Sequence, residues 1–277
     1  MQTIRKSEDA ILRSLAIFPY MLGKQVTRLL YSDGSHRSVL EIMKKLFDEG
    51  YVERKPLPSQ IQKGSVPYVY FLSAHGRHYL ESLEYDFSMW RLPSEMKLVQ
   101  SSHLWHCLAV NDFLIAGINT AHSNPHVKLI ETQHDLLMKY LELPAQPDGW
   151  QLFHLKGSEE AAVWLELDRG TEKIKVWKKK VETLLTYIHS GYENDFHTPV
   201  VTVAVVVPYS IPNREHRCRE LRLWTQQVLT ATKQEYEYDV FRFISLPEDM
   251  QADTLYLAPC WERPFSEEKY PLLEIES

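Results

Sequence analysis

Two carboxylates lie two residues apart in the apolar run AAVWLELD, and a lysine-rich segment follows directly. Because successive side chains of a strand alternate between its faces, we expect Glu166 and Asp168 on one face of one strand. Asp148 lies just before a further apolar run, which predicts a neighbouring strand. Carboxylate oxygens favour Mg²⁺, so we expect Asp148 and Glu166 to bind the metal. Lys180 or Lys178 from the following helix would stabilise negative charge that develops on a phosphate.

These residues resemble the PD-(D/E)xK nuclease pattern, with "PD" ending at Asp148 and "ExD" running from Glu166 to Asp168. The pattern has lysine where this chain has Asp168. The predicted catalytic set therefore adds Lys180 to the three carboxylates. Two alternatives stay open. Either the site is catalytically inactive, or the carboxylates only form salt bridges with Arg169 and the lysine-rich helix while Asp148 makes a Pro-Asp-Gly turn.

Helical and extended patterns alternate around these residues. A long amphipathic segment from about residue 95 to residue 122 predicts a helix. The runs VKLIET and AAVWLELD, on either side of Asp148, predict strands, and a helix is predicted from Thr171 to Ser190. The run from Val200 to Val207 is uniformly apolar, as is typical of a strand covered on both faces. The order helix, three strands, helix, strand predicts an α/β domain around a mixed sheet.

Three predicted helices and a predicted hairpin make up the N-terminal third. The spacing of apolar residues predicts a first helix after Ser7, a second around Val26 to Leu30, and a third from Val39 to Phe47 that ends at Gly50. The runs YVERKPL and VPYVYFL are separated by the polar PSQIQKGS, which predicts a hairpin. This order is typical of a winged helix-turn-helix, in which the third helix enters the major groove of DNA and the hairpin lies along the backbone. The alternative is a unit of three helices that only docks another protein.

Positive charge is concentrated in this N-terminal third. Residues 1–83 hold 12 Lys and Arg against 8 Asp and Glu, whereas the whole chain has a net charge of −6. Because DNA binding requires cations that face phosphates, we expect double-stranded DNA to contact the third helix and the hairpin. The predicted recognition residues are Ser35, His36, Arg37, Ser38, Glu41 and Lys45. The predicted hairpin contacts are Arg54, Lys55, Gln62 and Lys63.

Composition limits the class of protein. The chain has 277 residues, of which 44% are apolar, so it can fill the cores of two domains. No window approaches the ~18 consecutive apolar residues of a membrane helix, and the first residues lack the apolar core of a signal peptide. We therefore expect a cytoplasmic protein without membrane contacts. The three cysteines are widely spaced, which argues against a disulfide framework or a CxxC zinc cluster and predicts reduced thiols.

Six segments in order resemble the replication-relaxation family of plasmids and other mobile elements. They are LLYSDGSHRSVLEIMKKLFDEGYVERKPL, YVYFLSAHGRHYL, HCLAVNDF, PDGWQLF, LELDRGTE and VVTVAVVVP, and the resemblance extends from Asp9 to about Trp261. It implies an N-terminal winged helix joined to a domain similar to PD-(D/E)xK nucleases, with a role in replicating the element or in relaxing its DNA. On the family pattern the marked positions are Glu166, Asp168, Arg169, Thr171 and Glu172, and in the preceding helix His106, Asn111 and Asp112.

These predictions divide the chain into a winged helix-turn-helix domain at residues 1–84, a linker at 85–94, a nuclease-like domain at 95–262 and an acidic C-terminal tail at 263–277. We expect a DNA-binding protein of a mobile element that acts in replication or relaxation, or in their regulation, with a degenerate nuclease-like domain. The alternatives are a Mg²⁺-dependent endonuclease and a winged-helix transcriptional regulator. Because winged-helix proteins often bind paired half-sites, we expect a homodimer. Other replication or mobile-element proteins are candidate partners.

Overall fold

The computed structural model describes residues 4–57, 66–87, 101–135, 142–157, 159–246 and 252–275 of the chain. The chain forms two compact units, residues 1–115 and residues 116–277. The division between them falls inside the long helix α5 (Ser101–Ser123). Within the predicted linker, residues 88–94 lie outside the described residues.

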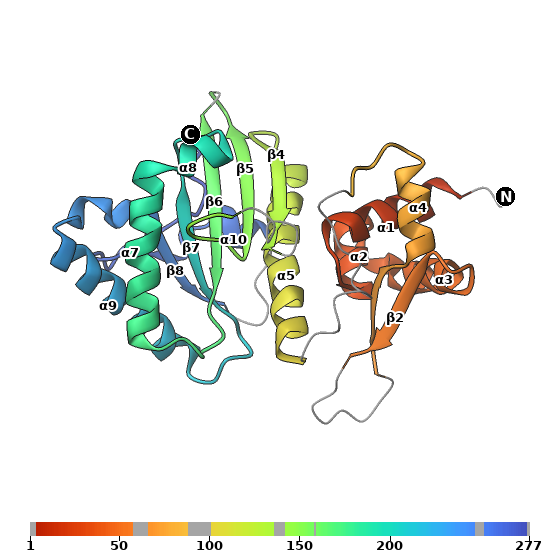
Figure 1. The fold of residues 1–277 in the computed structure, drawn as a ribbon, viewed down its shortest axis with the longest axis horizontal. Coiled ribbons are helices and arrows are strands. Elements are labelled where there is room, and N and C mark those ends of the chain that lie inside the picture. Colours follow the sequence, from red (N-terminus) through yellow and green to blue (C-terminus); the bar gives the residue numbers. More distant parts are fainter. Residues whose placement is uncertain are drawn as a thin grey trace. The chain divides into compact units, whose positions relative to one another are not determined.

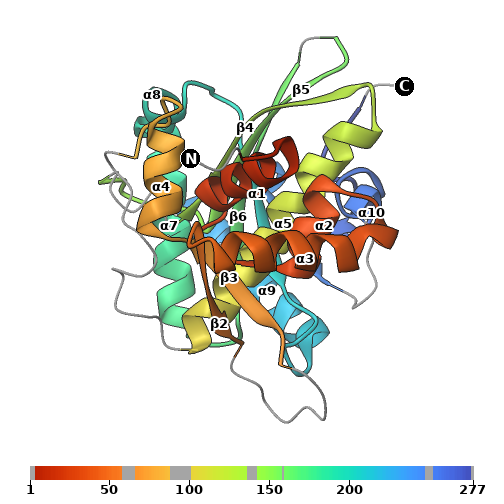
Figure 2. The ribbon, with the colours of Figure 1, turned by 90° about the vertical axis from the view of Figure 1, so that its right-hand side faces the viewer.

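The N-terminal unit combines helices with a small antiparallel sheet (Figures 1 and 2). Its elements are α1 (Lys6–Ile17), β1 (Met21–Leu22), α2 (Gly23–Leu30), the 3-10 turn η1 (Asp33–Ser35), α3 (His36–Asp48), β2 (Val52–Pro56), β3 (Tyr68–Leu72) and α4 (Ala74–Glu81). The sheet has the strand order β1-β3-β2. The three predicted helices and the predicted pair of strands are therefore present, although residues 58–65 between β2 and β3 lie outside the described residues.

Local chemistry explains where these helices begin and end. The Glu8 carboxylate accepts a hydrogen bond from the backbone N–H of Arg5 at 2.9 Å, which satisfies a donor at the start of α1. The Ser73 hydroxyl accepts the Gly76 N–H at 3.0 Å and caps α4 in the same way. After α3, Gly50 has φ +79°, a backbone conformation that residues other than glycine rarely adopt. These features mark the starts of α1 and α4 and the end of α3.

The apolar stripes of α1, α2 and α3 face a common core. Each stripe follows helical spacing, and its side chains are shielded from solvent together with those of β3. The buried members are Ile11, Leu12, Leu15, Val26, Val39, Met43, Leu46, Val69 and Phe71. Because this core occupies one side of α3, the opposite side of that helix is left exposed to solvent.

The C-terminal unit is built on a seven-stranded sheet with the order β10-β9-β8-β7-β6-β5-β4. Its strands are β4 (Val127–His134), β5 (Gly149–Leu155), β6 (Glu160–Leu167), β7 (Thr202–Val207), β8 (Phe241–Ser245), β9 (Trp261–Glu262) and β10 (Lys269–Tyr270). β4, β5 and β6 pair antiparallel, whereas β6, β7 and β8 pair parallel. The predicted mixed sheet is therefore confirmed, and it extends three strands beyond the predicted ones.

Helices cover both faces of this sheet. They are α7 (Ile174–Ser190), α8 (Tyr192–Phe196), α9 (Arg214–Thr232), the 3-10 turn η2 (Glu235–Val240) and α10 (Ala252–Leu257). α7, α8 and α9 pack on one face around the buried side chains of Trp164, Trp177 and Leu221 (Figure 1). On the other face, Tyr256 of α10 donates a hydrogen bond to Gln151 of β5 at 2.6 Å. Both faces of the central strands are thus covered, which explains their uniformly apolar sequence.

The last described residues continue this core. Leu272 and Leu273 are buried, and their N–H groups donate to the Tyr256 carbonyl at 3.1 and 2.9 Å. Glu274 accepts from Arg242 at 3.1 Å and also pairs with Arg263. The segment predicted as an acidic tail therefore has its apolar residues packed on α10.

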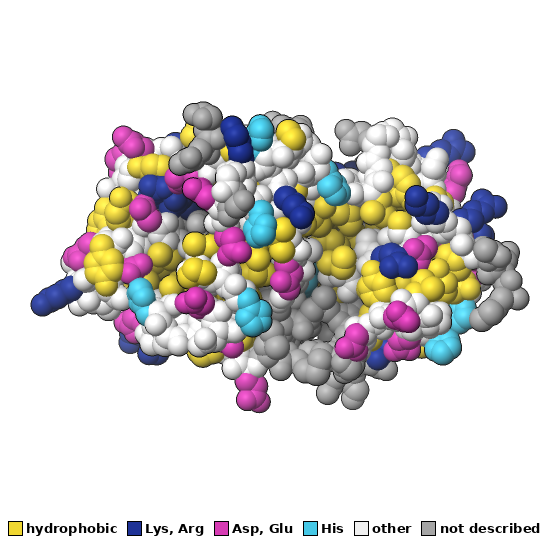
Figure 3. Space-filling view, turned by 90° about the horizontal axis from the view of Figure 1, so that it is seen from above, with side chains coloured by type: hydrophobic (Ala, Val, Ile, Leu, Met, Phe, Trp, Pro, Cys, Tyr) yellow, Lys and Arg dark blue, Asp and Glu magenta, His cyan; other side chains and the backbone are white. Residues whose placement is uncertain are grey.

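The surface carries charges of both signs. On the face drawn in Figure 3, Lys and Arg side chains are interspersed with Asp and Glu side chains. None of the helices in the described part of the chain is long and apolar enough to cross a membrane.

Candidate functional site

Two carboxylates from neighbouring strands come together at one end of the large sheet. β5 begins where β6 ends, because these strands are antiparallel, and Asp148 directly precedes β5. The Asp148 N–H donates to the Leu165 carbonyl at 2.9 Å, and its Oδ2 accepts the Leu167 N–H at 2.7 Å. These bonds hold the Asp148 side chain beside Glu166, the residue between the two partners.

Glu166 is almost fully buried, although it carries a carboxylate. Its Oε1 accepts the indole N–H of Trp164 at 2.8 Å, and its Oε2 forms an ion pair with Lys180. Burial raises the pKa of Glu166 to about 7, and the charge of Asp148 acts in the same direction, while Lys180 and the Trp164 N–H oppose it. The Glu166 carboxyl therefore takes up a proton more readily than an exposed carboxyl does.

Lys180 is the cation that α7 brings to this site. Burial by itself lowers the pKa of Lys180, but Glu166, Asp148 and Glu172 outweigh burial, so the pKa is raised and the amine stays protonated. Its Nζ lies 3.4 Å from Glu172 Oε1 in addition to the Glu166 contact. The structure thus brings together three of the four residues predicted as catalytic: Asp148, Glu166 and Lys180.

Asp168 is directed to a different partner. Both of its carboxylate oxygens accept from Arg217 of α9, at 2.7 Å from Nε and 3.0 Å from Nη2, and Oδ2 also accepts the Gly170 N–H at 3.0 Å. The Asp168 side chain is 1% exposed and that of Arg217 is 11% exposed. The Asp168 carboxylate is thus engaged by the Arg217 guanidinium and the Gly170 N–H.

Arg217 was not among the predicted site residues. A signal was present in the sequence. Arg217 falls on the same side of α9 as Leu221 and Val228, which are buried. An arginine on the apolar side of a helix must find a charged or hydrogen-bonding partner when it is buried. The sequence could not say which partner, because Asp168 is 49 residues away.

A metal ion at this end of the sheet would have few protein ligands. In the described ranges, no three His, Cys, Asp or Glu side chains gather in a way that could hold a metal ion. Mg²⁺ commonly uses one or two carboxylates and completes its shell with waters and substrate phosphates. Asp148 and Glu166 are such a pair, although Lys180 already forms an ion pair with Glu166 Oε2.

A second candidate surface lies on α3. The Arg37 side chain is 93% exposed and has an ion pair with the exposed Glu41 at 3.3 Å, and Ser38 is also exposed. His36 is half-buried, with Nδ1 3.0 Å from the Thr27 hydroxyl, and Ser35 lies in η1 directly before α3. Of the predicted recognition residues, Arg37, Ser38 and Glu41 are therefore exposed, whereas Ser35, His36 and Lys45 are partly buried.

Lys45 differs from Arg37 although both belong to α3. Its Nζ lies 2.6 Å from Glu8 and 3.6 Å from Glu49. The Glu8 side chain is 3% exposed. Burial alone raises the pKa of Glu8, but the Arg5 N–H and Lys45 outweigh burial and hold this pKa below its usual value. Lys45 therefore serves as the counter-ion of a buried carboxylate.

The predicted hairpin contacts are described only in part. The Arg54 guanidinium lies between two aromatic rings, 4.2 Å from the centre of Phe47 and 4.4 Å from that of Tyr68. Lys55 is exposed on β2. Gln62 and Lys63 lie outside the described residues.

The positions marked in α5 hold the N-terminal unit together. Asn111 is buried and donates from Nδ2 to the Tyr20 carbonyl at 2.5 Å. Gln25 of α2 donates to the Leu108 carbonyl at 2.8 Å and to the Asp112 carboxylate at 2.9 Å. Because these bonds satisfy buried polar groups, Asn111 and Asp112 have a structural role within residues 1–115.

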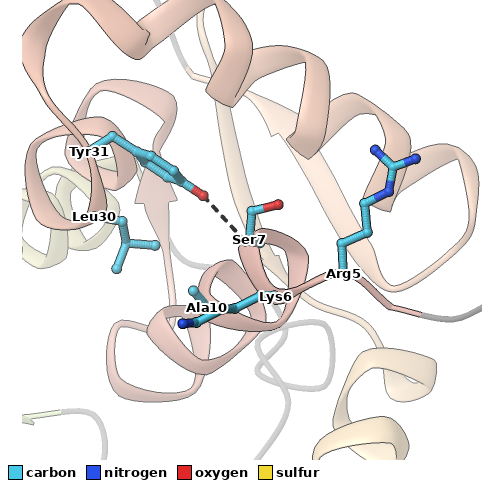
Figure 4. A pocket seen from close by; sticks show the side chains of 6 residues that line it. All are labelled: Arg5, Lys6, Ser7, Ala10, Leu30 and Tyr31. Carbon is cyan, nitrogen blue, oxygen red and sulfur yellow. Dashed lines mark hydrogen bonds between the residues drawn. The ribbon is translucent and has the colours of Figure 1, made fainter.

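A hollow in the N-terminal unit involves none of the predicted residues. Figure 4 shows it between the start of α1 and the end of α2, lined by Arg5, Lys6, Ser7, Ala10, Leu30 and Tyr31. The Tyr31 hydroxyl donates to the Ser7 carbonyl at 3.3 Å. The lining is mainly apolar and open to solvent, so it offers little that would orient a ligand.

A protein-family model covers more than half of the chain. The protein-family model described as replication-relaxation matches residues 12–202. No curated protein matches the chain. The matched range includes α3, Asp148, Glu166 and Lys180, and it ends before Arg217.

Proposed function

The chain belongs to the replication-relaxation family, and we propose that it is a DNA-binding protein of a plasmid or other mobile element. Its role is then in replication or relaxation of the element's DNA, or in the regulation of these processes. Within this role, the N-terminal unit binds double-stranded DNA, and the C-terminal unit is a degenerate nuclease-like domain. The proposal rests on the family match over both units and on the exposed polar side of α3.

A winged helix-turn-helix assignment of the N-terminal unit is supported by its element order. α1, α2 and α3 are followed by the antiparallel pair β2 and β3, and β1 completes the small sheet. In such domains the third helix reads the major groove and the hairpin contacts the backbone. Here α3 exposes Arg37, Ser38 and Lys44, and β2 exposes Lys55. These side chains would supply the phosphate and base contacts, and a homodimer would place two such helices on paired half-sites.

The nuclease-like assignment of the C-terminal unit is supported by the order α5, β4, β5, β6, α7, β7 and by the residues at its sheet end. Asp148 and Glu166 occupy the carboxylate positions of the PD-(D/E)xK pattern, and Asp168 occupies the lysine position. The ammonium group comes instead from Lys180 of α7, which pairs with Glu166. The domain would thus keep the two carboxylates and the ammonium group of a nuclease site, with the ammonium supplied from a helix and not from the strand.

A second candidate function, a Mg²⁺-dependent endonuclease, is favoured by the convergence of Asp148, Glu166 and Lys180. In that case the two carboxylates would hold the ion, and the bound ion would polarise a phosphate and activate a water molecule. The protonated Lys180 would face the negative charge that develops on the phosphate. The Leu167 N–H would keep Asp148 oriented, and the Trp164 N–H would do the same for Glu166.

Binding to DNA is the first test. The full chain is titrated into a fluorescently labelled duplex, and the doubly substituted Arg37→Ala, Lys55→Ala chain is compared with it. We expect weaker binding by the double variant, because two exposed cations are lost. Lys128→Ala, which removes an exposed cation of β4, is the matched control and should bind as the unaltered chain does. Equal binding by all three proteins would reject this surface.

Nicking of supercoiled plasmid separates the two candidate functions. The full chain is incubated with plasmid and Mg²⁺ or Mn²⁺, alongside Asp148→Ala. Nicking that disappears in the variant while DNA binding is retained supports the endonuclease. Retained binding without any nicking by the unaltered chain supports the DNA-binding role with an inactive domain.

A further inference from the structure

One side chain of α9 holds both ends of the segment that joins β6 to α7. This segment, residues 168–173, begins at Asp168, whose carboxylate accepts two hydrogen bonds from Arg217. Near its other end, the Glu172 carbonyl accepts from Arg217 Nη2 at 2.7 Å. Between them the backbone turns at Gly170, which has φ +75° and donates its N–H back to Asp168. A single guanidinium thus fixes where the segment starts and where it meets α7.

The guanidinium of Arg217 is itself restrained. Its Cζ lies 4.9 Å from the centre of the Trp224 ring, and Glu220 Oε2 lies 3.6 Å from Nη1. A planar guanidinium offers several donors in fixed directions, so it can grip a carboxylate and a carbonyl simultaneously. Lysine has one ammonium group and cannot reproduce that geometry.

The segment held by Arg217 carries a carboxylate that contacts Lys180. Glu172 Oε1 lies 3.4 Å from Lys180 Nζ, and the same ammonium pairs with Glu166 on the sheet. Bonds therefore connect Asp168, Arg217, Glu172, Lys180 and Glu166 in one continuous series. Because the Glu172 backbone is fixed by Arg217, the position of its carboxylate depends on that arginine.

We propose that Asp168 and Arg217 are positioning residues, which clamp residues 168–173 so that Glu172 holds the Lys180 ammonium against Glu166. The inference rests on the site of Asp148, Glu166 and Lys180 proposed above and assigns it a further part. In this role Asp168, at the lysine position of the nuclease pattern, contacts neither a metal ion nor a phosphate. Its role is to replace the missing lysine indirectly, by anchoring the segment that brings a different lysine into place.

Chemical reactivity of Lys180 in the full-length chain tests this clamp. Amines are labelled by reductive methylation, and the rate at each lysine is read by mass spectrometry. Lys175 and Lys179 are exposed on the same helix and serve as internal references. We expect Arg217→Ala to raise the labelling of Lys180 relative to these references by about tenfold, which corresponds to ~1.4 kcal/mol. Arg217→Lys should restore protection only in part.

The matched control is Arg222→Ala. Arg222 also belongs to α9 and forms an ion pair at 2.7 Å, but its partner is Glu262 on β9. Its loss should leave Lys180 protected. An equal rise in Arg222→Ala would show general loosening of α9 and overturn the proposal, as would unchanged labelling in Arg217→Ala.

Asp168→Asn provides the same test with a smaller perturbation. The amide oxygen can still accept the Gly170 N–H, so this variant serves if Arg217→Ala does not fold. It should raise Lys180 labelling in the same direction, and no rise would contradict the clamp. The readout needs neither DNA nor metal. A chain that fails to bind or nick DNA would reject the proposed function, whereas the labelling result would still decide whether the clamp exists.

Discussion

Two cations of α3 have such different surroundings that removing one should affect DNA binding and removing the other should affect stability. Arg37 is almost fully exposed, and its ion pair with Glu41 is formed at the surface. Lys45 is one third exposed and neutralises the buried Glu8 carboxylate. We therefore predict that Arg37→Ala weakens DNA binding without lowering stability, and that Lys45→Ala lowers stability without changing the number of phosphate contacts.

The size of the effect on binding follows from counterion release. Each phosphate contact contributes about 0.9 to the slope of log affinity against log salt concentration. Loss of Arg37 should lower that slope by about 0.9. The ratio of the affinity of the original chain to that of Arg37→Ala should therefore fall by roughly 3.5-fold between about 50 mM and about 200 mM salt. Because exposed ion pairs contribute little, the free energy of unfolding of Arg37→Ala should stay within about 0.5 kcal/mol of the original value.

Lys45→Ala should keep the original slope and show a lower melting temperature, because Glu8 loses its ion-pair partner while it stays buried. Fluorescence anisotropy of a labelled duplex over a KCl series measures the slopes, and circular dichroism measures the melting temperatures. Lys128→Ala is the control for both. The reasoning is refuted if Arg37→Ala retains the full slope, or if Lys45→Ala loses slope while its melting temperature is unchanged.

Three further predictions concern the framework that holds the two surfaces. In Gly76→Ala, the new Cβ would lie 2.1 Å from the Tyr51 carbonyl oxygen, so urea denaturation should show a loss of about 1–3 kcal/mol; an unchanged midpoint would contradict this contact. In Gly117→Ala, the Cβ would lie 2.2 Å from the buried Gln151 Oε1, and we expect a lower melting temperature, whereas Gly34→Ala, with open space around it, should melt as the unaltered chain does. The pKa of Glu8 is below its usual value in the folded chain, so its stabilising effect is present above the unfolded pKa of about 4.5 and is lost as the pH falls through the folded pKa. The melting-temperature difference between the original chain and Glu8→Gln should therefore narrow in acid, and a constant difference would count against this role.

Much of the fold follows from local patterns. The spacing of apolar residues predicted α1, α2, α3 and α7, and the uniformly apolar run before Pro208 predicted β7, because helices and strands impose their own periods on the chain. β8 was not predicted, since its five residues include Arg242 and form no distinct apolar run. That arginine is buried, and Glu274 and the Asp239 carbonyl accept its hydrogen bonds.

The sequence by itself determined which residue types were present and which shared a strand or a helix face, and its family pattern indicated a DNA-related role. The tertiary structure alone decided their partners. In the folded chain Asp168 pairs with Arg217, Glu166 pairs with Lys180, and Glu8 pairs with Lys45. The physical reason is that backbone geometry sets periods over a few residues, and these are visible in the sequence. Ion pairs between residues dozens of positions apart depend on how whole elements pack, and no local period records that packing.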